Sequence, residues 1–427
     1  MKVWVVTMNF PIPGETFAVG DVRTLKDAQV DVSVHALRFA HPDAPRLTAQ
    51  HLADVPITRS SKRAILRGLL EMFKRPALTL HFLAWLTTQM LGNPRRNLKY
   101  RLKQLAKSFA LVPRSLQLFG KLEQERPDVV HLFWGHYPAM FAHLVQKRYP
   151  EIVSSVFLGA YDLEAAYGGS ASVARHADIL WTHARANVAD IQQLGVQDAR
   201  IRVAYRGAKL QRFEGIDWQR KVKRRIVSAG RLGAFKKMDD VLRVFQQTLQ
   251  RWPDATLVIL GDGPERARLE ALARTLSVAH AVTFRGHVAH AEVFEAMARS
   301  EVFLLMSQHG AERLPNVIKE AMGCRCVCVT TQTPGIEELL VHGEYGFVVP
   351  QGDVEGAAQH IAEIFAGNVD ALRFTQAAYA HLERHFDIER IARIYKDTWR
   401  DLVEEKRKVR SASEQEAKSE EVRRTSA

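Results

Sequence analysis

Two glutamates, Glu312 and Glu320, stand eight positions apart around the start of a predicted helix. A strand-like apolar run at 302–307 leads into a polar loop, and the helix begins near Pro315, a residue that suits the first helical position. Glu312 is therefore expected in the loop and Glu320 in the second turn of the helix. Because the first N–H groups of a helix have no partner within it, they hold anions and oxygen-rich groups well. The stretch predicts a binding site for such a ligand.

Two cations, Arg231 and Lys236, follow the predicted strand RRIVSAG. Arginine grips phosphate oxygens with a planar fork, and lysine supplies a mobile point charge. Taken alone, either residue would be interpreted as part of a solvated helix start. Their position in series with the glutamate pair favours a phosphate site.

A glycine turn, GDGPER, follows the apolar strand TLVIL. Gly261 and Gly263 allow a tight turn, and Pro264 can start the next helix. Arg266 stands where a dinucleotide-binding fingerprint would have its third glycine, which argues against that fingerprint. By itself the turn would also fit an ordinary strand-to-helix connection.

Together these motifs resemble retaining glycosyltransferases of family 4, which have the GT-B fold. Arg231 and Lys236 match the family's G-R-L-x-x-x-K pattern, with Lys237 where glycine is usual. The turn at Gly261 matches G-x-G-P, and the two glutamates match the E-x7-E segment. The resemblance implies two Rossmann-like α/β domains facing across a cleft, with a nucleoside-diphosphate sugar as the donor.

The resemblance also implies roles for single residues. It assigns Arg231 and Lys236 to the leaving diphosphate, Glu312 to the hydroxyls of the donor sugar and Glu320 to the hydroxyls of the ribose. A carboxylate suits a vicinal diol because it accepts two hydrogen bonds. Glu338 matches the glutamate of a further family pattern in TPGIEELLVHGEYGFVVP. The other positions placed at the donor are Gly14, Gly261, Gly263, Arg313 (where the family often has glycine), Leu314, Pro315 and Asn316.

The N-terminal half resembles the family less closely. The loop NFPIPGETF after the first strand is similar to the opening P-x-x-S-E-T-F, with Gly14 at the serine position; a plain turn over 11–17 is the equal alternative. Leu158 stands where the family commonly has a histidine near the donor sugar and acceptor. Asp162 or His136 is the candidate base in its place. The alternatives are that Asp162 caps a helix and that His136 is an ordinary loop residue.

The length of 427 residues suits two domains, and alternating strands and helices predict parallel α/β units. The expected division is an acceptor-side domain over 1–214, a donor domain over 215–385, a helix crossing back over 386–404, and a disordered tail over 405–427.

The net charge of +13 belongs to a helical insert at 58–121, which carries 14 Lys or Arg and one acidic residue. Its basic amphipathic pattern indicates an anionic membrane surface. The alternative is a helical subdomain packed on the first sheet. Nucleic acid is not expected, because the insert has no recognition motif and no aromatic platform. No signal peptide or membrane span is predicted, so the protein is expected in the cytoplasm, peripheral to the inner membrane face.

The expected activity is retaining sugar transfer to a glycan, lipid-linked, in surface polysaccharide synthesis. No cofactor and no metal are expected: the chain has no D-x-D motif, and Cys324, Cys326 and Cys328 lack the usual metal-site spacing. A sugar-nucleotide epimerase on the same fold is the second enzymatic hypothesis. A non-enzymatic membrane- or polyanion-binding module is the third.

Overall fold

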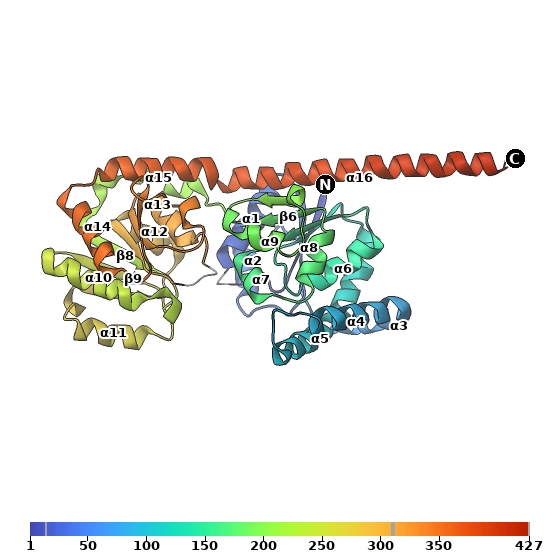
Figure 1. Cartoon of the computed structure of the whole chain (residues 1–427), viewed down its shortest axis with the longest axis horizontal. Helices are drawn as coiled ribbons and strands as arrows, with labels where there is room; N and C mark the ends of the chain where they lie inside the picture. The colour runs from blue at the N-terminus through green and yellow to red at the C-terminus, as the bar shows by residue number, and fades with distance from the viewer. Residues whose placement is uncertain (13–14, 309–311, 426–427) are drawn as a thin grey trace. The chain divides into compact units, whose positions relative to one another are not determined.

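The computed structural model describes residues 1–12, 15–308 and 312–425, and the chain forms two compact units. Unit 1 comprises Met1–His183, Asn187–Ala204 and Glu389–Ala427; unit 2 comprises Ala184–Ala186 and Tyr205–Ile388. Each is an α/β unit with a parallel sheet, as the sequence predicts (Figure 1).

The division falls earlier than the expected boundary at 214. Phe213 lies in the core of unit 2, and the Ala208 N–H donates to Phe386 O at 2.7 Å. The residues just before the expected boundary therefore pack with the second unit.

The sheet of unit 1 has the order β3-β2-β1-β4-β5-β6-β7 in the described residues, with parallel pairing throughout. The chain order reverses beside β1, between β2 and β4, where doubly wound sheets open a crevice at their carboxyl ends. The strands are β1 (Lys2–Thr7), β2 (Asp31–Ala36), β3 (Ile57–Thr58), β4 (Val129–Leu132), β5 (Val153–Phe157), β6 (Ile179–Thr182) and β7 (Ile201–Val203).

Helices flank this sheet, and three of them, α3, α4 and α5, make up the basic insert (Figure 1). The helices are α1 (Thr16–Asp27), α2 (Ala44–His51), α3 (Lys62–Lys74), α4 (Pro76–Leu91), α5 (Leu98–Glu125), α6 (Ala139–Arg148), α7 (Ala160–Ala165), α8 (Ser170–His176) and α9 (Val188–Gln192).

The insert is partly core and partly exposed. Phe82 and Leu86 of α4 and Phe119 of α5 are buried in the main cluster of unit 1. α3 crosses α5 closely at Gly68, where an added Cβ would lie 1.8 Å from Pro113 O. The subdomain interpretation is thus correct for these faces.

The outer face of α3 has a different character. Leu66, Leu70 and Phe73 follow helical spacing and are 61%, 53% and 84% exposed, and Leu69 is exposed beside them. Leu80 of α4 is also exposed. These five residues are called the apolar stripe below.

The sheet of unit 2 has the order β10-β9-β8-β11-β12-β13 and is parallel among the described residues. Its strands are β8 (Val222–Ala229), β9 (Thr256–Leu260), β10 (Val282–Gly286), β11 (Ser300–Leu305), β12 (Val327–Thr331) and β13 (Gly346–Val349). Its helices are α10 (Met238–Arg251), α11 (Arg266–Thr275), α12 (His290–Ala298), α13 (Asn316–Gly323), α14 (Val354–Ala366) and α15 (Ala371–His385).

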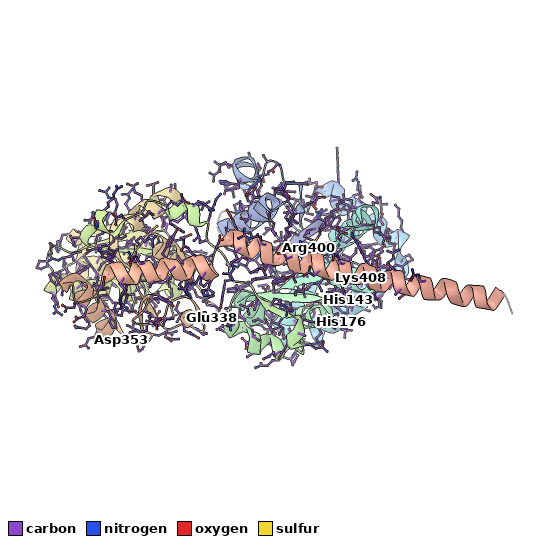
Figure 2. All side chains as sticks on the ribbon, turned by 90° about the horizontal axis from the view of Figure 1, so that it is seen from above. His143, His176, Glu338, Asp353, Arg400 and Lys408 are labelled. Carbon is purple, nitrogen blue, oxygen red and sulfur yellow. The ribbon has the colours of Figure 1, made fainter. Side chains whose placement is uncertain are left out.

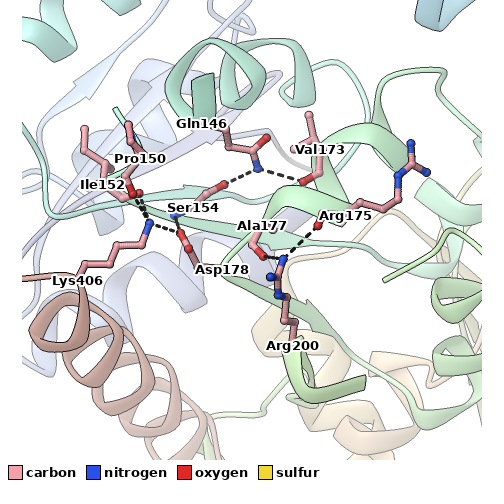
Figure 3. Close-up of polar contacts among 10 residues, drawn as sticks. All are labelled: Gln146, Pro150, Ile152, Ser154, Val173, Arg175, Ala177, Asp178, Arg200 and Lys406. Atoms are coloured by element: carbon pink, nitrogen blue, oxygen red, sulfur yellow. Dashed lines mark hydrogen bonds and ion pairs between the residues drawn. The ribbon is translucent and has the colours of Figure 1, made fainter. Parts of the chain in front are cut away.

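The last helix, α16 (Ile388–Thr425), belongs to unit 1 from Glu389 onward. Trp399 is fully buried there, and its indole N–H donates to Ser155 Oγ at 2.9 Å. Further along, Lys406 pairs with Asp178 at 2.7 Å and donates to Ile152 O, so the helix is held at two points (Figure 3). Figure 2 labels Arg400 and Lys408 on this helix.

The disordered tail expected over 405–427 differs from the structure, in which α16 continues to Thr425. The segment lacks apolar spacing, which was the basis of the prediction. It is nevertheless rich in Glu, Lys, Arg and Ala and has no Gly or Pro, so its intrinsic helix propensity is high.

Candidate functional site

The loop after β8 places two predicted cations differently. Lys236 is only 8% exposed, and its ammonium group contacts the Glu312 carboxylate. Arg231 is exposed, and its guanidinium has no hydrogen bond or ion pair with a described residue. The structure therefore brings Lys236 and Glu312 together and leaves the fork of Arg231 open to a ligand.

Lys237 adopts a left-handed conformation with φ of 49° as the N-cap of α10. Only glycine reaches that region without strain, which explains why glycine is usual in the family pattern. Because Lys236 contacts Glu312, it is the lysine to assign to the site.

Gly261 and Gly263 bring the turn after β9 against the Arg231 loop. An added Cβ would lie 2.0 Å from Gly230 O at the first position and 2.4 Å from Leu232 O at the second. The backbones are also bonded, since Leu232 N–H donates to Asp262 O at 3.0 Å. These glycines therefore act through close backbone packing that supports Arg231.

Glu312 has a second carboxylate oxygen, Oε2, that is buried and accepts no hydrogen bond from the described residues. A buried acceptor without a donor is costly, so this oxygen suits a ligand hydroxyl. The neighbouring segment 309–311 lies outside the described residues.

The stretch from Arg313 to Asn316 forms the entry to α13. Leu314 is buried in the core of unit 2, Pro315 is the N-cap, and α13 begins at Asn316, one residue later than predicted. Arg313 does not occur among the described non-glycine residues with positive φ, so arginine is compatible with its backbone. Asn316 Oδ1 accepts from the buried Lys319 Nζ at 3.0 Å.

Glu320 lies in the second turn of α13, as predicted. His290 Nε2 on α12 is 2.9 Å from Glu320 Oε1. The sequence reasoning missed His290, and its only signal was a histidine at the start of a helix after β10. The pairing fixes the orientation of the Glu320 carboxylate, which stays half-buried.

Glu338 has a different environment. Its carboxylate accepts from Arg185 N–H at 2.7 Å, Ala186 N–H at 3.0 Å and Tyr205 OH at 3.0 Å. All these groups belong to unit 2. Because its oxygens hold these donors, Glu338 serves to fix the Ala184–Ala186 segment. The contact of Glu338 with the sugar nucleotide stays a prediction.

In unit 1, Asp162 and His136 form a pair. His136 Nδ1 is 2.9 Å from Asp162 Oδ1, and the other oxygen of Asp162 accepts from Gly159 N–H at 3.0 Å. Asp162 is buried, so it caps α7 and orients the histidine at once. Leu158 is a core residue. The histidine ring beside the next residue is that of His183, which a Cβ added at Gly159 would meet at 3.3 Å.

A cavity of about 430 Å³ opens where β1 and β4 end, and His136 lines it. The rings of Tyr137 and Tyr161 meet the His136 ring edge-on, with centroids 5.9 and 6.2 Å away. Glu15, which precedes α1, also lines the cavity. Gly14 lies outside the described residues. This cavity, called the aromatic cavity below, has the composition of a small polar-ligand site.

Neither a metal cluster nor a membrane span is found in the described parts of the chain. No group of three or more His, Cys, Asp or Glu side chains there could hold a metal ion. None of the described helices combines the length and apolar character needed to cross a bilayer.

Comparison with known proteins identifies unit 2. Residues 216–381 match the family model of glycosyl transferases group 1. Over 168 residues (39% of this chain and 43% of the relative), the chain is 29% identical to an N-acetyl-alpha-D-glucosaminyl L-malate synthase of Bacillus anthracis. Over 149 residues (35% and 43%), it is 34% identical to the lipopolysaccharide core biosynthesis glycosyltransferase LpsE of Rhizobium meliloti. The chain spans less than half the length of these curated relatives.

The fold resembles that of a solved structure over most of both chains. Anabaena Alr3699/HepE, in complex with UDP, superposes with a TM-score of 0.70 and 16% identity, covering 94% of this chain and all of that one. The predicted two-domain α/β fold of the GT-B type is thereby confirmed.

Proposed function

From the premise that this chain carries a glycosyl transferases group 1 domain on a GT-B fold, we propose that it moves a sugar from a nucleoside-diphosphate sugar to a glycan acceptor. The observation that carries the proposal is the contact between Lys236 and Glu312, with the open guanidinium of Arg231 on the same loop. This arrangement places cations that can bind a diphosphate next to a carboxylate that can bind the hydroxyls of a sugar.

Unit 2 would hold the donor. When the bond between C1 of the sugar and the phosphate oxygen breaks, negative charge grows on the leaving diphosphate, and Arg231 and Lys236 would stabilise it. Glu312 Oε2 would accept from a sugar hydroxyl, and Glu320, oriented by His290, from the ribose. The UDP bound to the Anabaena protein supports a nucleoside diphosphate as ligand.

Unit 1 would hold the acceptor in the aromatic cavity. The acceptor oxygen forms the new bond to C1, and its proton must leave. His136 is the group of this unit that would take the proton, with Asp162 as its positioning residue. The alternative recipient is the leaving phosphate itself. Retention of configuration would require the acceptor oxygen to approach C1 from the face that the phosphate leaves, and neither path needs a metal.

The proposal also includes attachment of the enzyme to a membrane surface. The apolar stripe on α3 and α4 is exposed, and the insert around it is strongly basic. An apolar face flanked by cations is typical of helices that lie in the headgroup layer of an anionic membrane. A cytoplasmic enzyme bound to the inner face would meet lipid-linked acceptors of polysaccharide synthesis there.

The test is a screen of sugar nucleotides with the purified full chain, measuring release of nucleoside diphosphate with and without a lipid extract. We expect one sugar nucleotide to be consumed, and its consumption to be faster when the lipid extract is present. Consumption should continue when EDTA is added. Arg231→Met should abolish consumption while the protein stays folded by circular dichroism. An altered sugar formed without acceptor would favour the epimerase hypothesis, and no donor binding at all would overturn the enzymatic proposal.

A further inference from the structure

Lys221 comes immediately before β8, at the amino-terminal edge of the sheet of unit 2. The donor residues Lys236 and Glu312 follow β8 and β11, at the opposite edge of that sheet. Lys221 is only 8% exposed, and its ammonium group contacts neutral atoms of the described residues. Because a charge is costly to remove from water, a buried cation usually has an anionic partner. The burial of Lys221 therefore requires another explanation.

Four backbone carbonyl oxygens converge on the Lys221 ammonium group. They belong to Ser300, Cys324, Met297 and Ala298 and lie 2.7, 2.9, 3.1 and 3.2 Å from Nζ. An ammonium group has three N–H donors, so it cannot give each of four carbonyls a full hydrogen bond of its own. It binds instead as a charge centred among carbonyl dipoles, which is how a ring of carbonyls holds K⁺.

A thiol completes the surroundings of this ammonium group without supplying a negative charge. Cys326 Sγ lies 3.8 Å from Lys221 Nζ and donates to Met297 O at 3.1 Å. Burial raises the pKa of the Cys326 thiol, so the sulfur is uncharged at neutral pH. Among the described residues, the charge of Lys221 is therefore balanced by the carbonyl dipoles.

These carbonyls come mainly from the ends of two helices. Met297 and Ala298 are the last two residues of α12, and Cys324 is the C-cap of α13. The last carbonyls of a helix have no N–H partner within it and form the negative end of its dipole, so a cation stabilises them. A single ammonium group serves both helix ends and thereby fastens α12 to α13.

The fastened ends are connected to the pair formed by Glu320 and His290. Cys324 N–H donates to Glu320 O at 2.9 Å, one turn back along α13. Cys324 Sγ lies 3.7 Å from Phe294 O on α12, and the Phe294 and His290 rings have centroids 4.4 Å apart. Because His290 Nε2 contacts Glu320 Oε1, the contacts form a closed loop that runs through both helices.

We propose that Lys221 is a positioning residue for the nucleoside diphosphate. Its ammonium group takes the role of a bound monovalent cation that holds α12 and α13 together, and this alignment keeps Glu320 against His290. Lys221 lies at the other edge of the sheet and acts without contacting the ligand. This inference rests on the proposed function, in which Glu320 binds the ribose, and adds a distant residue on which the ribose contact depends.

The test compares Lys221→Met, which keeps a long side chain and removes its charge, with Lys223→Met. Lys223 is a neighbouring lysine of β8 whose side chain is 85% exposed, so this control removes the same charge from nearly the same place. Calorimetry with UDP should show about 5- to 10-fold weaker binding for Lys221→Met and no change for Lys223→Met. Inorganic diphosphate should bind both variants like the unaltered chain, because Arg231 and Lys236 are untouched.

Two further measurements distinguish positioning from a general loss of stability. In a Glu320→Ala chain, Lys221→Met should cause no further loss of UDP affinity, because both changes remove the same ribose contact. Lys221→Ala lacks the side chain beyond Cβ, and propylammonium supplies the missing carbons together with the charge. Propylammonium present throughout purification should restore UDP binding to Lys221→Ala, whereas propanol should not.

Cys324→Ala decides the question if Lys221→Met does not fold. It keeps the ammonium group and its carbonyl partners but removes the Sγ contact with α12, so it should weaken UDP binding and leave diphosphate binding unchanged. Normal UDP affinity in the deciding variant, equal losses for UDP and diphosphate, or a loss that adds to that of Glu320→Ala overturns the inference. If the unaltered chain binds UDP, these results leave the proposed function standing. An unaltered chain that does not bind UDP overturns both.

Discussion

His136 Nδ1 lies 2.9 Å from Asp162 Oδ1, and this contact leaves the other ring nitrogen, Nε2, for the cavity that the histidine lines. The carboxylate fixes which nitrogen faces the ligand, because the bond to Nδ1 selects the tautomer and the ring orientation. His136 is therefore the residue expected to contact an acceptor, and Asp162 acts through it.

The first prediction concerns this pair. His136→Ala should lower kcat for transfer by about 10²–10⁴, the usual range for a general base, with UDP affinity unchanged. Asp162→Asn should also lower kcat and shift the pH profile, since the histidine loses its orienting anion. Both are measured as transfer to an acceptor, with calorimetry for UDP. If both variants transfer at the normal rate, the proton passes to the leaving phosphate instead.

The second prediction separates two adjacent lysines. Lys236→Ala should lower kcat by about 10²–10³, the cost of losing one donor to a developing anion. Lys237→Gly relieves a left-handed residue, at which side chains cost about 1–2 kcal/mol, against the greater freedom of glycine in the unfolded chain. Its activity should stay normal, and its free energy of unfolding should be unchanged or raised by up to about 1 kcal/mol. Loss of activity in Lys237→Gly alone would reassign the site to that residue.

The third prediction concerns the ribose carboxylate. Glu320→Ala should weaken UDP binding about 10–100-fold, as expected for a lost hydrogen bond to a charged group. His290→Ala should weaken it less, because the carboxylate remains and loses only its orientation. Calorimetry with UDP and with inorganic diphosphate checks this. Equal losses for both ligands would show that these residues do not contact the ribose.

The fourth prediction concerns the apolar stripe. Burying one large apolar side chain contributes about 1.5–3 kcal/mol, so changing Leu66, Leu70 and Phe73 to serine should reduce vesicle binding by at least about 100-fold. Anionic vesicles should bind the unaltered chain in a salt-sensitive manner, and neutral vesicles weakly. Leu372→Ser, at an exposed leucine of unit 2, is the control for co-sedimentation. Unchanged binding of the triple variant would assign attachment to charge alone.

The fifth prediction concerns acid. Burial lowers the pKa of His131 to about 3, and burial with nearby His81 and Lys147 lowers that of His143 to about 4. Both folded-state values lie below the unfolded value of about 6.5, so the unfolded chain binds protons first as the pH falls. Above a pH of about 6.5, the free energy of unfolding should not depend on these two histidines. Below that pH it should fall by about 1.4 kcal/mol per pH unit for each histidine.

Denaturant titrations of unit 1 fluorescence between pH 8 and pH 4, on the order of one pH unit apart, check this slope. His131→Asn should flatten the curve, whereas His51→Asn, at an exposed position, should not. The same slope in both variants would mean that His131 has no part in it.

The sequence predicted the local parts of the site and missed the partners that come from elsewhere in the chain. Glu312, Glu320 and Lys236 are found by spacing because each belongs to a short local motif on the loop or helix that follows a strand. The contact of Lys236 with Glu312 joins residues 76 positions apart, and His290 reaches Glu320 from another helix. Glu338 matched a family pattern yet holds backbone N–H groups, because its position along the chain does not reveal what packs against it.

The fold class could be predicted from the alternation of strands and helices. The boundaries between the two units could not be predicted in this way. Phe213 was expected in the first domain, which was predicted to end at 214, but its side chain is buried among those of unit 2. The amphipathic pattern of the insert predicts an exposed apolar face, and Leu98, Leu102 and Phe109 of α5 are exposed in the structure. The later part of α5 packs in the core, and α3 carries the apolar stripe, which the sequence did not single out.

The place of α16 in unit 1 has a consequence for the order in which the protein is made. Trp399 fills the interior of a unit whose first strand begins at residue 2, and all but three residues of unit 2 are translated between the two other stretches of unit 1 and this helix. During synthesis, domains generally fold as units from the N-terminus. Here the sheet of unit 1 must wait on the ribosome with the Trp399 position unfilled until unit 2 has emerged. A chaperone that shields this surface would be needed for as long as the translation of unit 2 takes.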